Sequence, residues 1–397
     1  MRYVGTIVRG IRTPIIKEDT DLVETVISSV MKAQESEGFT FKDRDIIAIT
    51  EAVVGISEGN YVTVDDIAKD VLAKFPTKEV GLVYPILSRN RFSMILKGIA
   101  RAMDKITMFL SFPKDEVGNG IMDELTLANS PFNLNSIITE KDYNAYFSDF
   151  LHPFTGINMV SFYKELIESE NCKVEFVFSN NKEDILKYTN NIINCDIHER
   201  YETNKLLKNL KAHVYGLYEI MNKPINGSGF NEKYGLLGSN KSTEEKLKLF
   251  PRTGETLVTT IQNKMYELTG KTIEVMVYGD GAFKDPVGGI WELADPVVSP
   301  AYTKGLIGTP NEIKLKYVSD NIYSSLRGDE LADAIRKEIK SKKQNLTGNM
   351  LSQGTTPRRL TDLIGSLCDL TSGSGDKGTP VVYIQGYFDN YADNNEE

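Results

Sequence analysis

Short apolar runs typical of β-strands alternate with capped helices along this chain, and they do so at irregular intervals. A regular doubly wound sheet requires strand and helix to follow each other in steady repetition. The irregular order favours an α+β fold, with mixed or antiparallel sheets and packed helices. The chain has 397 residues, of which 41% are hydrophobic, so we expect two or more lobes with a large core.

Caps and periodicity indicate individual helices and strands. Asp19 or Thr20 precedes a helix whose apolar residues follow helical spacing over 22–31. Thr63 and Asp66 have the spacing of a capping box and predict a second helix. Four further elements are predicted: a buried strand at 46–49, a helix at 91–106, a strand at 272–278 and a helix at 328–342.

The composition changes in the middle of the chain. Asparagine and lysine become frequent after about residue 123, and helical stretches outnumber strands up to about residue 270. We therefore expect an inserted lobe at 123–270 between two parts of one core, 1–122 and 271–397.

Charge and hydropathy exclude several classes of partner. Acidic residues exceed basic ones by 55 to 46, for a net charge of -9, and no basic cluster alternates with aromatic residues. Nucleic acid is therefore not an expected partner, and an anionic ligand requires a local positive site. No apolar run approaches the roughly 18 residues of a membrane span. The N-terminus lacks the apolar stretch of a signal peptide, so we expect a cytoplasmic protein.

Cysteine and histidine usage argues against several chemistries. The cysteines are odd in number and widely spaced, which makes a disulfide framework or a CxxC site improbable. The histidines show no ligand spacing such as HxxxH, and nothing supports histidine-driven nucleophilic catalysis. These residues are Cys172, Cys195, Cys368, His152, His198 and His213.

A glycine-rich segment lies near the C-terminus, between a helix expected to begin at Thr356–Pro357 and an apolar strand. Its string Gly373-x-Gly375-x-x-Gly378 matches the dinucleotide pattern, which must instead follow a strand and open a helix. It is therefore not a Rossmann turn. Two interpretations remain open: a phosphate-binding loop that contains Lys377, or a helix cap at Gly373 followed by a surface turn.

Two acidic turns are candidates for metal binding. Asp280 follows an apolar strand and precedes a glycine-rich turn with Asp285. Oxygen ligands at the end of a strand suit Mg²⁺ or Mn²⁺, whereas the plainer interpretation is an Asp-Gly turn with solvated acids. The turn 114–119, which contains Asp115, is open to the same two interpretations.

Taken together, four stretches of the chain resemble the coenzyme F420-0:gamma-glutamyl ligase family, over about the first 120 and last 125 residues. The fold that this resemblance implies is the ligase core of that family with an inserted lobe. The matching stretches are Thr13-Pro14-Ile15-Ile16-Lys17-Glu18, Asp45-Ile46-Ile47 leading to Ser57-Glu58-Gly59, the Asp280 segment, and Asp369-Leu370-x-x-Gly373 through Gly378-x-Pro380-Val381-Val382.

The resemblance implies a site for GTP and divalent metal. Asp280 and Asp115 are the implied Mg²⁺ or Mn²⁺ ligands, and Asp280 and Lys377 the implied catalytic residues. The implied nucleotide-binding residues are Thr13, Pro14, Ile15, Ile16, Lys17, Asn119, Gly373, Ser374, Gly375, Asp376, Lys377 and Gly378. The chain departs from the family pattern at Ile56, Ser374 and Gly281, where the family has lysine, glutamine and threonine.

The implied reaction is phosphoryl transfer from GTP to an acceptor carboxylate, followed by attack of the glutamate amine to form an amide. Such chemistry needs positioning and charge neutralisation more than a covalent nucleophile. The partners implied are a nucleotide, glutamate, a carboxylate acceptor and a second copy of the chain in a homodimer. Two alternatives are the same chemistry on another small carboxylate, and a non-catalytic nucleotide or metabolite sensor.

Overall fold

The first lobe is built on a five-stranded sheet with the order β1-β16-β2-β12-β15. β2 and β12 run parallel, and the other neighbouring pairs are antiparallel. The computed structural model describes residues 3–153, 155–279, 282–284, 291–293, 299–353, 358–372 and 376–393. The strands of this sheet are β1 (Ile7–Ile11), β2 (Ile46–Thr50), β12 (Glu274–Tyr278), β15 (Ala301–Tyr302) and β16 (Val381–Gln385).

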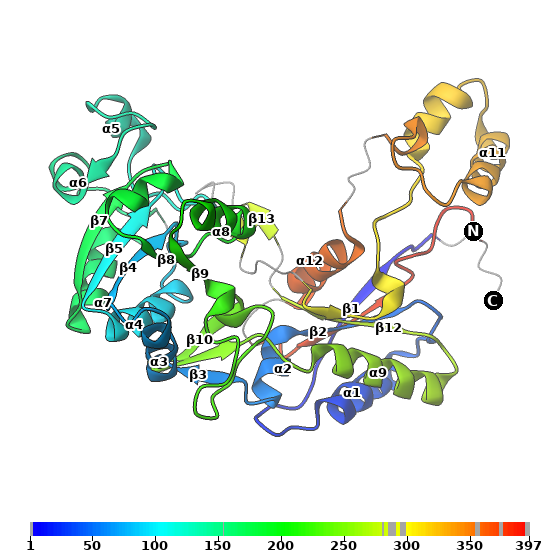
Figure 1. Ribbon diagram of the computed structural model, residues 1–397. Coiled ribbons are helices and arrows are strands. Elements are labelled where there is room, and N and C mark those ends of the chain that lie inside the picture. The colour runs from blue at the N-terminus through cyan, green and yellow to red at the C-terminus, as the bar shows by residue number, and fades with distance from the viewer. Residues whose placement is uncertain are drawn as a thin grey trace.

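Both faces of this sheet are covered by helices (Figure 1). Along β2, Ile47 and Ile49 pack with the core under α1 (Leu22–Glu37) and α9 (Gly254–Thr269). Ile46 and Ala48 point the other way and pack with the core under α12 (Leu360–Ser372). Successive side chains of a strand point to opposite faces, so an uninterrupted apolar run is what a two-sided burial requires. The short helix α2 (Glu51–Ser57) follows β2 directly.

The second lobe contains a six-stranded sheet with the order β6-β7-β5-β4-β8-β9. The chain starts at β4, adds β5 and β7 on one side, then returns to add β8 and β9 on the other, all in parallel. This is a doubly wound order, and the direction of growth reverses between β4 and β8. The strands are β4 (Glu79–Val83), β5 (Lys105–Leu110), β6 (Ile138–Thr139), β7 (Lys173–Phe178), β8 (Asn191–Asn194) and β9 (His213–Gly216).

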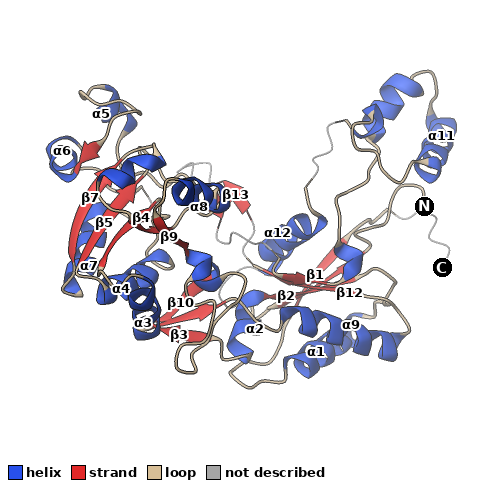
Figure 2. Ribbon diagram, viewed as in Figure 1, coloured by secondary structure: helices blue, strands red, loops and turns tan. Residues whose placement is uncertain are grey.

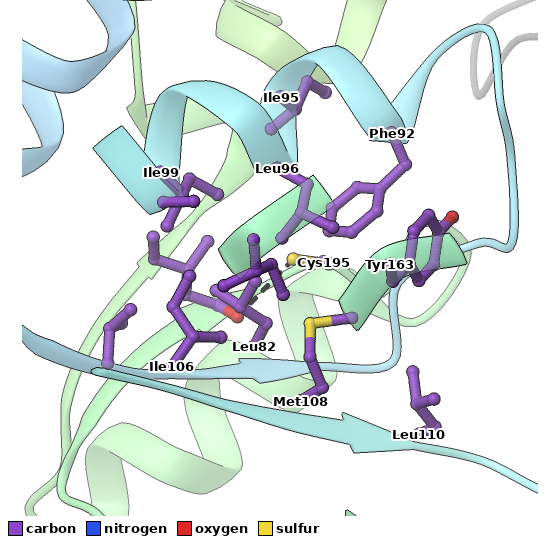
Figure 3. Close-up of a cluster of buried hydrophobic side chains, with 14 of the residues drawn as sticks. Leu82, Phe92, Ile95, Leu96, Ile99, Ile106, Met108, Leu110, Tyr163 and Cys195 are labelled. Carbon is purple, nitrogen blue, oxygen red and sulfur yellow. Dashed lines mark hydrogen bonds between the residues drawn. The ribbon is translucent and has the colours of Figure 1, made fainter. Parts of the chain in front are cut away.

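Helices lie on both faces of the second sheet as well (Figure 2). On one face, Ile95, Leu96 and Ile99 of α4 cover Leu82 of β4 and Ile106 of β5 (Figure 3). On the other, Leu207 of α8 packs with residues of β4, β5 and β8. The helices of this lobe are α3 (Val64–Lys74), α4 (Phe92–Ala102), α5 (Glu124–Ala128), α6 (Glu140–Tyr146), α7 (Met159–Ser169) and α8 (Arg200–Asn209).

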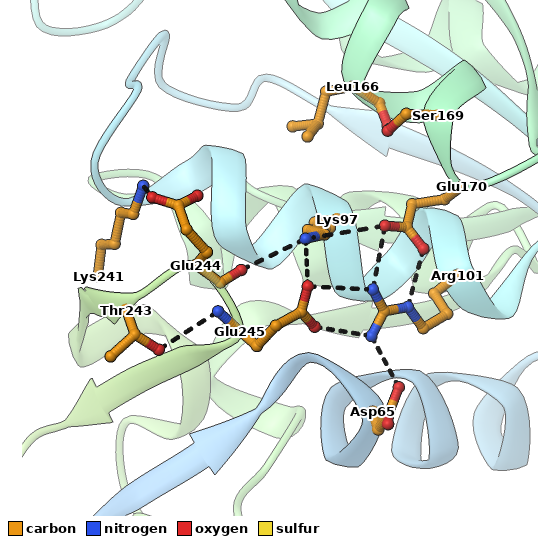
Figure 4. Close-up of polar contacts among 10 residues, drawn as sticks. All are labelled: Asp65, Lys97, Arg101, Leu166, Ser169, Glu170, Lys241, Thr243, Glu244 and Glu245. Carbon is orange, nitrogen blue, oxygen red and sulfur yellow. Dashed lines mark hydrogen bonds and ion pairs between the residues drawn. The ribbon is translucent and has the colours of Figure 1, made fainter.

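An ion-pair network ties α4 to its neighbours (Figure 4). The Arg101 guanidinium bonds Glu170, directly after α7, at 2.8 Å, Asp65 of α3 at 2.8 Å and Glu245 at 2.9 Å. Glu245 lies in the turn between β10 (Ser239–Thr243) and β11 (Lys246–Leu249), which form a small sheet with β3 (Tyr61–Thr63). Arg101 and Lys97 hold the pKa of Glu245 at about 2, so the network is charged at neutral pH.

A smaller helical unit follows β15 in the chain. It contains α10 (Leu315–Tyr317) and α11 (Gly328–Ser341), which close over Ile313, Val318 and Leu346. Between β12 and β15 the strands β13 (Ala282–Lys284) and β14 (Trp291–Leu293) form a two-stranded sheet. No helix in the described ranges is long and apolar enough to cross a membrane.

The α+β prediction is confirmed for the chain as a whole, while the expected division at residues 122 and 270 does not coincide with the sheets. β4 and β5 precede residue 123, yet they are central strands of the second lobe. α9 precedes residue 270, yet it packs on the sheet of the first lobe. The second lobe therefore runs from about residue 61 to residue 250.

Several local predictions are confirmed and two are corrected. Thr63 and Asp66 form the capping box of α3, but α1 is capped by Asp21, whose side chain accepts from the Glu24 N–H. Asp19 adopts a left-handed φ of 64°, and the Thr20 hydroxyl accepts from Lys17 N–H instead. α4 ends at Ala102, short of residue 106, because β5 begins at residue 105. The three cysteines are free and buried, and the expected helix start at Thr356–Pro357 lies outside the described residues.

Candidate functional site

Strand register brings several predicted segments to one edge of the first sheet. Ile11, the last residue of β1, lies opposite Val381, the first residue of β16. Val381 also lies opposite Ile49 of β2, and Thr50 pairs with Tyr278, the last residue of β12. The segments that follow β1, β2 and β12, and the segment that precedes β16, therefore all leave the sheet at the same edge, which we call the register edge.

Hydrogen bonds join the segments that meet at the register edge. The Thr13 N–H donates to the Gly378 carbonyl at 3.3 Å, and the Thr50 N–H donates to the Pro380 carbonyl at 2.9 Å. The Thr379 hydroxyl donates to the Ser372 carbonyl at 3.0 Å, which ties together the two ends of the glycine-rich segment. The two stretches predicted to bind a nucleotide, 13–17 and 373–378, are thus neighbours in space where both are described.

The segment after Thr13 continues to the end of α2. The Asp19 N–H donates to the Ser57 carbonyl at 3.1 Å. The Glu18 carboxylate lies against Gly59, where an added Cβ would lie 2.5 Å from Oε1. Gly59 also has a φ of +59°, which favours glycine. The motif Ser57-Glu58-Gly59 thus packs beside the motif that ends at Glu18.

The register edge carries exposed cations. Arg12, Lys17 and Lys377 are exposed, and their side chains form no ion pair or hydrogen bond with any described residue. Glu18 and Asp376 are exposed beside them and partly offset their charge. An exposed cation without a carboxylate partner is available to an anionic ligand, and the effect is local because the whole chain is acidic.

Part of the predicted site lies outside the described residues, namely Asp280, Gly373, Ser374, Gly375 and the departure at Gly281. The residues on either side of them are described. Gly279 is buried directly after β12, and Ser372 and Asp376 flank residues 373–375. Pro14 and Ile15 are exposed, Ile15 at 86%, whereas Ile16 packs against the core of the first lobe.

Asp115 belongs to the second lobe, in the loop after β5, and not to the register edge. Its carboxylate accepts four N–H donors: from Leu87 at 2.9 Å, Val117 at 3.1 Å, and both the backbone and the side-chain amide of Asn119 at 2.7 and 2.8 Å. Burial raises the pKa of Asp115 to about 6, against the opposing effect of these donors. Because both oxygens accept hydrogen bonds, this carboxylate has a structural role: it holds its own loop together.

Asn119 and His152 continue the hydrogen-bond network of Asp115. The Asn119 Oδ1 atom lies 3.1 Å from His152 Nε2, and His152 Nδ1 accepts from the Thr155 N–H at 3.3 Å. His152 Nε2 therefore carries the proton that Asn119 accepts. Burial, and then the charge of Arg89, lower the pKa of His152, so the ring is neutral at pH 7. The amide of Asn119, predicted to contact a nucleotide, is thus bonded at both ends within the lobe.

Other buried carboxylates are bonded inside the first lobe, at the edge opposite to the register edge. Asp45 accepts from the Lys42 N–H at 2.8 Å and from the Tyr383 hydroxyl, and burial raises its pKa. Glu274 accepts from the Gly305 N–H at 3.2 Å and from Gln262 at 3.3 Å. No group of three histidine, cysteine or acidic side chains suited to a metal occurs within the described residues.

Reasoning from the sequence missed a polar group at the carboxyl ends of β5, β7 and β8. Glu116 accepts from the N–H groups of Ile197 and His198 and lies 2.6 Å from His198 Nδ1. Lys182 bonds Asp196 at 2.7 Å and Glu199 at 2.6 Å. The available signal was positional, since acidic residues occur in the loops that follow the apolar runs of β5 and β8.

A family model described as F420-0:Gamma-glutamyl ligase matches residues 10–386, which is nearly the whole chain. No curated protein matches the chain significantly.

Proposed function

The chain belongs to the F420-0:gamma-glutamyl ligase family, and on that premise we propose that it is a GTP- and divalent-metal-dependent ligase joining L-glutamate to a carboxylate acceptor of the F420-0 kind. Family membership makes it a ligase that acts on small molecules. The nucleotide, the metal, the acyl-phosphate route and a homodimeric assembly are our proposal.

The convergence of strands at the register edge supports the proposal most. Thr13 and Gly378 come from opposite ends of the chain and are joined by a hydrogen bond. β12 delivers Gly279 to the same edge, which brings the chain there directly before Asp280. Binding of a metal-bound polyphosphate requires backbone amides, cations and a strand-end aspartate at one place.

The proposed chemistry needs no covalent nucleophile from the protein. A carboxylate oxygen of the acceptor attacks the γ-phosphorus of GTP, which gives an acyl phosphate and releases GDP. The glutamate amine then attacks the acyl carbon and loses a proton, and inorganic phosphate leaves as the amide forms. Bound metal would neutralise phosphate charge, and Lys377 and Lys17 would add positive charge from the register edge.

The proposed metal ligand is Asp280. The metal role of Asp115 stays a prediction, since the carboxylate would have to exchange N–H donors for the cation. The nucleotide role of Asn119 stays a prediction for the same reason, because its amide is bonded to Asp115 and His152.

Nucleotide binding is tested by thermal unfolding with GTP or ATP in the presence of Mg²⁺ or Mn²⁺. We expect protection by GTP that requires metal, is lost in Asp280→Ala and is reduced about tenfold in apparent affinity in Lys377→Ala. Lys340→Ala removes an exposed lysine of α11 and is the matched control. Equal protection in all three variants, or none in the wild type, contradicts the proposal.

Turnover is tested with an acceptor whose carboxylate is labelled with ¹⁸O. An acyl phosphate transfers one of these oxygens to the released inorganic phosphate, so we expect one ¹⁸O per phosphate formed. Unlabelled phosphate would exclude this route. Protection by GTP without phosphate release from any carboxylate offered would instead support a nucleotide sensor.

A further inference from the structure

A cavity of about 350 Å³ lies in the second lobe, beside the carboxyl ends of β4 and β8. Ile86 and Ser88 of the loop after β4 line it, as do Cys195 and Ile197 of the loop after β8. These are the two strands between which the sheet reverses its direction of growth. Open parallel sheets bind ligands at this position, because the loops on either side diverge there.

One side of this cavity is electropositive. Arg89 is an exposed residue of its lining, and its guanidinium forms no ion pair or hydrogen bond with any described residue. The first turn of α4 contributes Phe92 and Ile95 to the wall, so the positive end of the dipole of an 11-residue helix faces this region. His152, also in the wall, is neutral, so the positive charge on this side comes from Arg89 and the helix end.

A sequestered hydroxyl lies in the same wall. The Thr155 Oγ1 atom is shielded from solvent and has no hydrogen-bond partner among the described residues. Buried hydroxyls without a partner are rare in native structures and each calls for an explanation, such as a ligand that supplies the missing bond. The backbone N–H of Thr155 is already used by His152.

The remaining walls are apolar and firmly held. Met159, Leu217 and Leu236 are buried in the core of the lobe and line the cavity. The bonds from Asp115 to Leu87 and Asn119 fix two of the surrounding loops to each other. A cavity of this size, lined by both apolar and polar side chains, suits a small ligand that has one charged end and an apolar body.

We propose that this cavity, the switch-point pocket, binds a small anion, a carboxylate or phosphate ester, that carries an aromatic or aliphatic body of about one ring. The anion lies between Arg89 and the first turn of α4, the apolar body lies against Met159 and Leu236, and Thr155 bonds a polar atom of the ligand. The site belongs to the second lobe and does not depend on the ligase reaction.

Binding is measured by calorimetry on the full chain, without GTP or metal and at constant ionic strength. The probes are phenyl phosphate, phenylacetate, benzyl alcohol and inorganic phosphate. We expect one of the two aromatic anions to bind at least tenfold more tightly than both benzyl alcohol and inorganic phosphate, and the preferred anion identifies the head group. Equal affinity for all four probes overturns the proposal. So does the absence of binding of either aromatic anion at ligand concentrations up to about 10 mM.

Three variants locate the site. Arg89→Ala should weaken aromatic-anion binding about tenfold, and Ile86→Trp, which fills the cavity from a half-buried position, should abolish it. Thr155→Val should weaken binding while leaving the ligand-free unfolding temperature unchanged, since the hydroxyl has no partner to lose. Lys205→Ala removes an exposed charge of α8 and is the control. Binding that survives both Arg89→Ala and Ile86→Trp in folded protein overturns the assignment.

Discussion

Two adjacent carboxylates, Asp115 and Glu116, hold together the loops at the carboxyl ends of the second sheet. Asp115 accepts from Leu87 in the loop after β4, and Glu116 accepts from Ile197 and His198 in the loop after β8. From sequence, the turn that contains Asp115 was open to two interpretations, solvated acids or a metal site, and Glu116 was given no role of its own. Their structural role could not be predicted because their N–H donors come from loops that are distant in the chain. Only the order of the strands in the sheet brings these loops together.

Asp115→Asn should destabilise the protein by about 3 kcal/mol, although it removes a buried charge. Each Asp115 oxygen accepts two N–H groups, so the amide nitrogen of an asparagine would face two donors. Urea unfolding measures the change. Asp104→Asn, at an exposed carboxylate, is the control and should change stability by less than about 0.5 kcal/mol. A neutral effect of Asp115→Asn would rule out this structural role.

The His198–Glu116 pair should make stability depend on pH. The hydrogen bond to Glu116 raises the pKa of His198 above 6.5, despite partial burial and the nearby Arg200. The stabilisation is therefore complete below pH 6.5 and is lost as the pH rises through the raised value. Unfolding of wild type and His198→Gln from pH 5.5 to 9 should show a difference that shrinks toward high pH. A difference that grows with pH would contradict the sign of the shift.

Gly59 has a left-handed backbone conformation and lies against Glu18, in the segment that leaves the register edge after β1. Gly59→Ala and Gly38→Ala should each cost about 1 kcal/mol, because both residues have a positive φ. Only at Gly59 does the new Cβ meet a neighbour, the Glu18 carboxylate. We therefore expect Gly59→Ala, but not Gly38→Ala, to weaken protection by GTP in thermal unfolding. Equal GTP protection in the two variants would show that the position of Glu18 does not matter for the nucleotide.

Among the helices and strands, those with local signals could be predicted and those defined by distant partners could not. The capping box of α3 and the apolar run of β2 are complete within a few residues. The cap of α1 was misplaced because Asp19, Thr20 and Asp21 are all capping residue types, and the choice depends on the bond from Asp19 to Ser57. The segments of the register edge were found by their motifs, but their proximity results from pairing across the sheet.

Helix α4 depends on Arg101 for its ties to α7 and to the β10–β11 turn. Arg101→Gln should lower the free energy of unfolding by about 1 to 2 kcal/mol at low salt, since Glu170 is only 14% exposed. The loss should diminish in about 1 M salt, where exposed charges are screened. Lys78→Gln, which removes an exposed pair with Asp104, should have almost no effect. Urea titrations at both salt concentrations measure this, and a salt-independent loss would indicate packing rather than charge.

The division into lobes was the least predictable feature of the molecule. The strands β4 and β5 lie before the change in composition at residue 123, and only their pairing with β7 and β8 assigns them to the second lobe. The doubly wound order was missed for the same reason, because the crossovers of the chain differ in length and one contains α5, β6 and α6. Composition reports where a segment differs and not which strands it pairs with.

A fragment of residues 60–250 should therefore fold by itself, whereas a fragment of 123–270 should not. The longer fragment keeps the whole six-stranded sheet, and the other lacks its two central strands. Circular dichroism and urea unfolding should show a cooperative transition for 60–250 alone. A cooperative transition for 123–270 would restore the division expected from sequence.

The antiparallel pairing of β1 with β16 has a consequence for how the protein is made. Strand β1 (residues 7–11) cannot pair with β16 until residues 381–385 have been synthesised. The strands of the second lobe, in contrast, have all been synthesised once residue 250 has left the ribosome. At ribosomal speeds of roughly 5–20 residues per second, that wait lasts on the order of ten seconds beyond the second lobe. A nascent chain thus acquires its doubly wound lobe first and its register edge last, so a truncated translation product would carry the switch-point pocket but lack the Thr13–Gly378 contact.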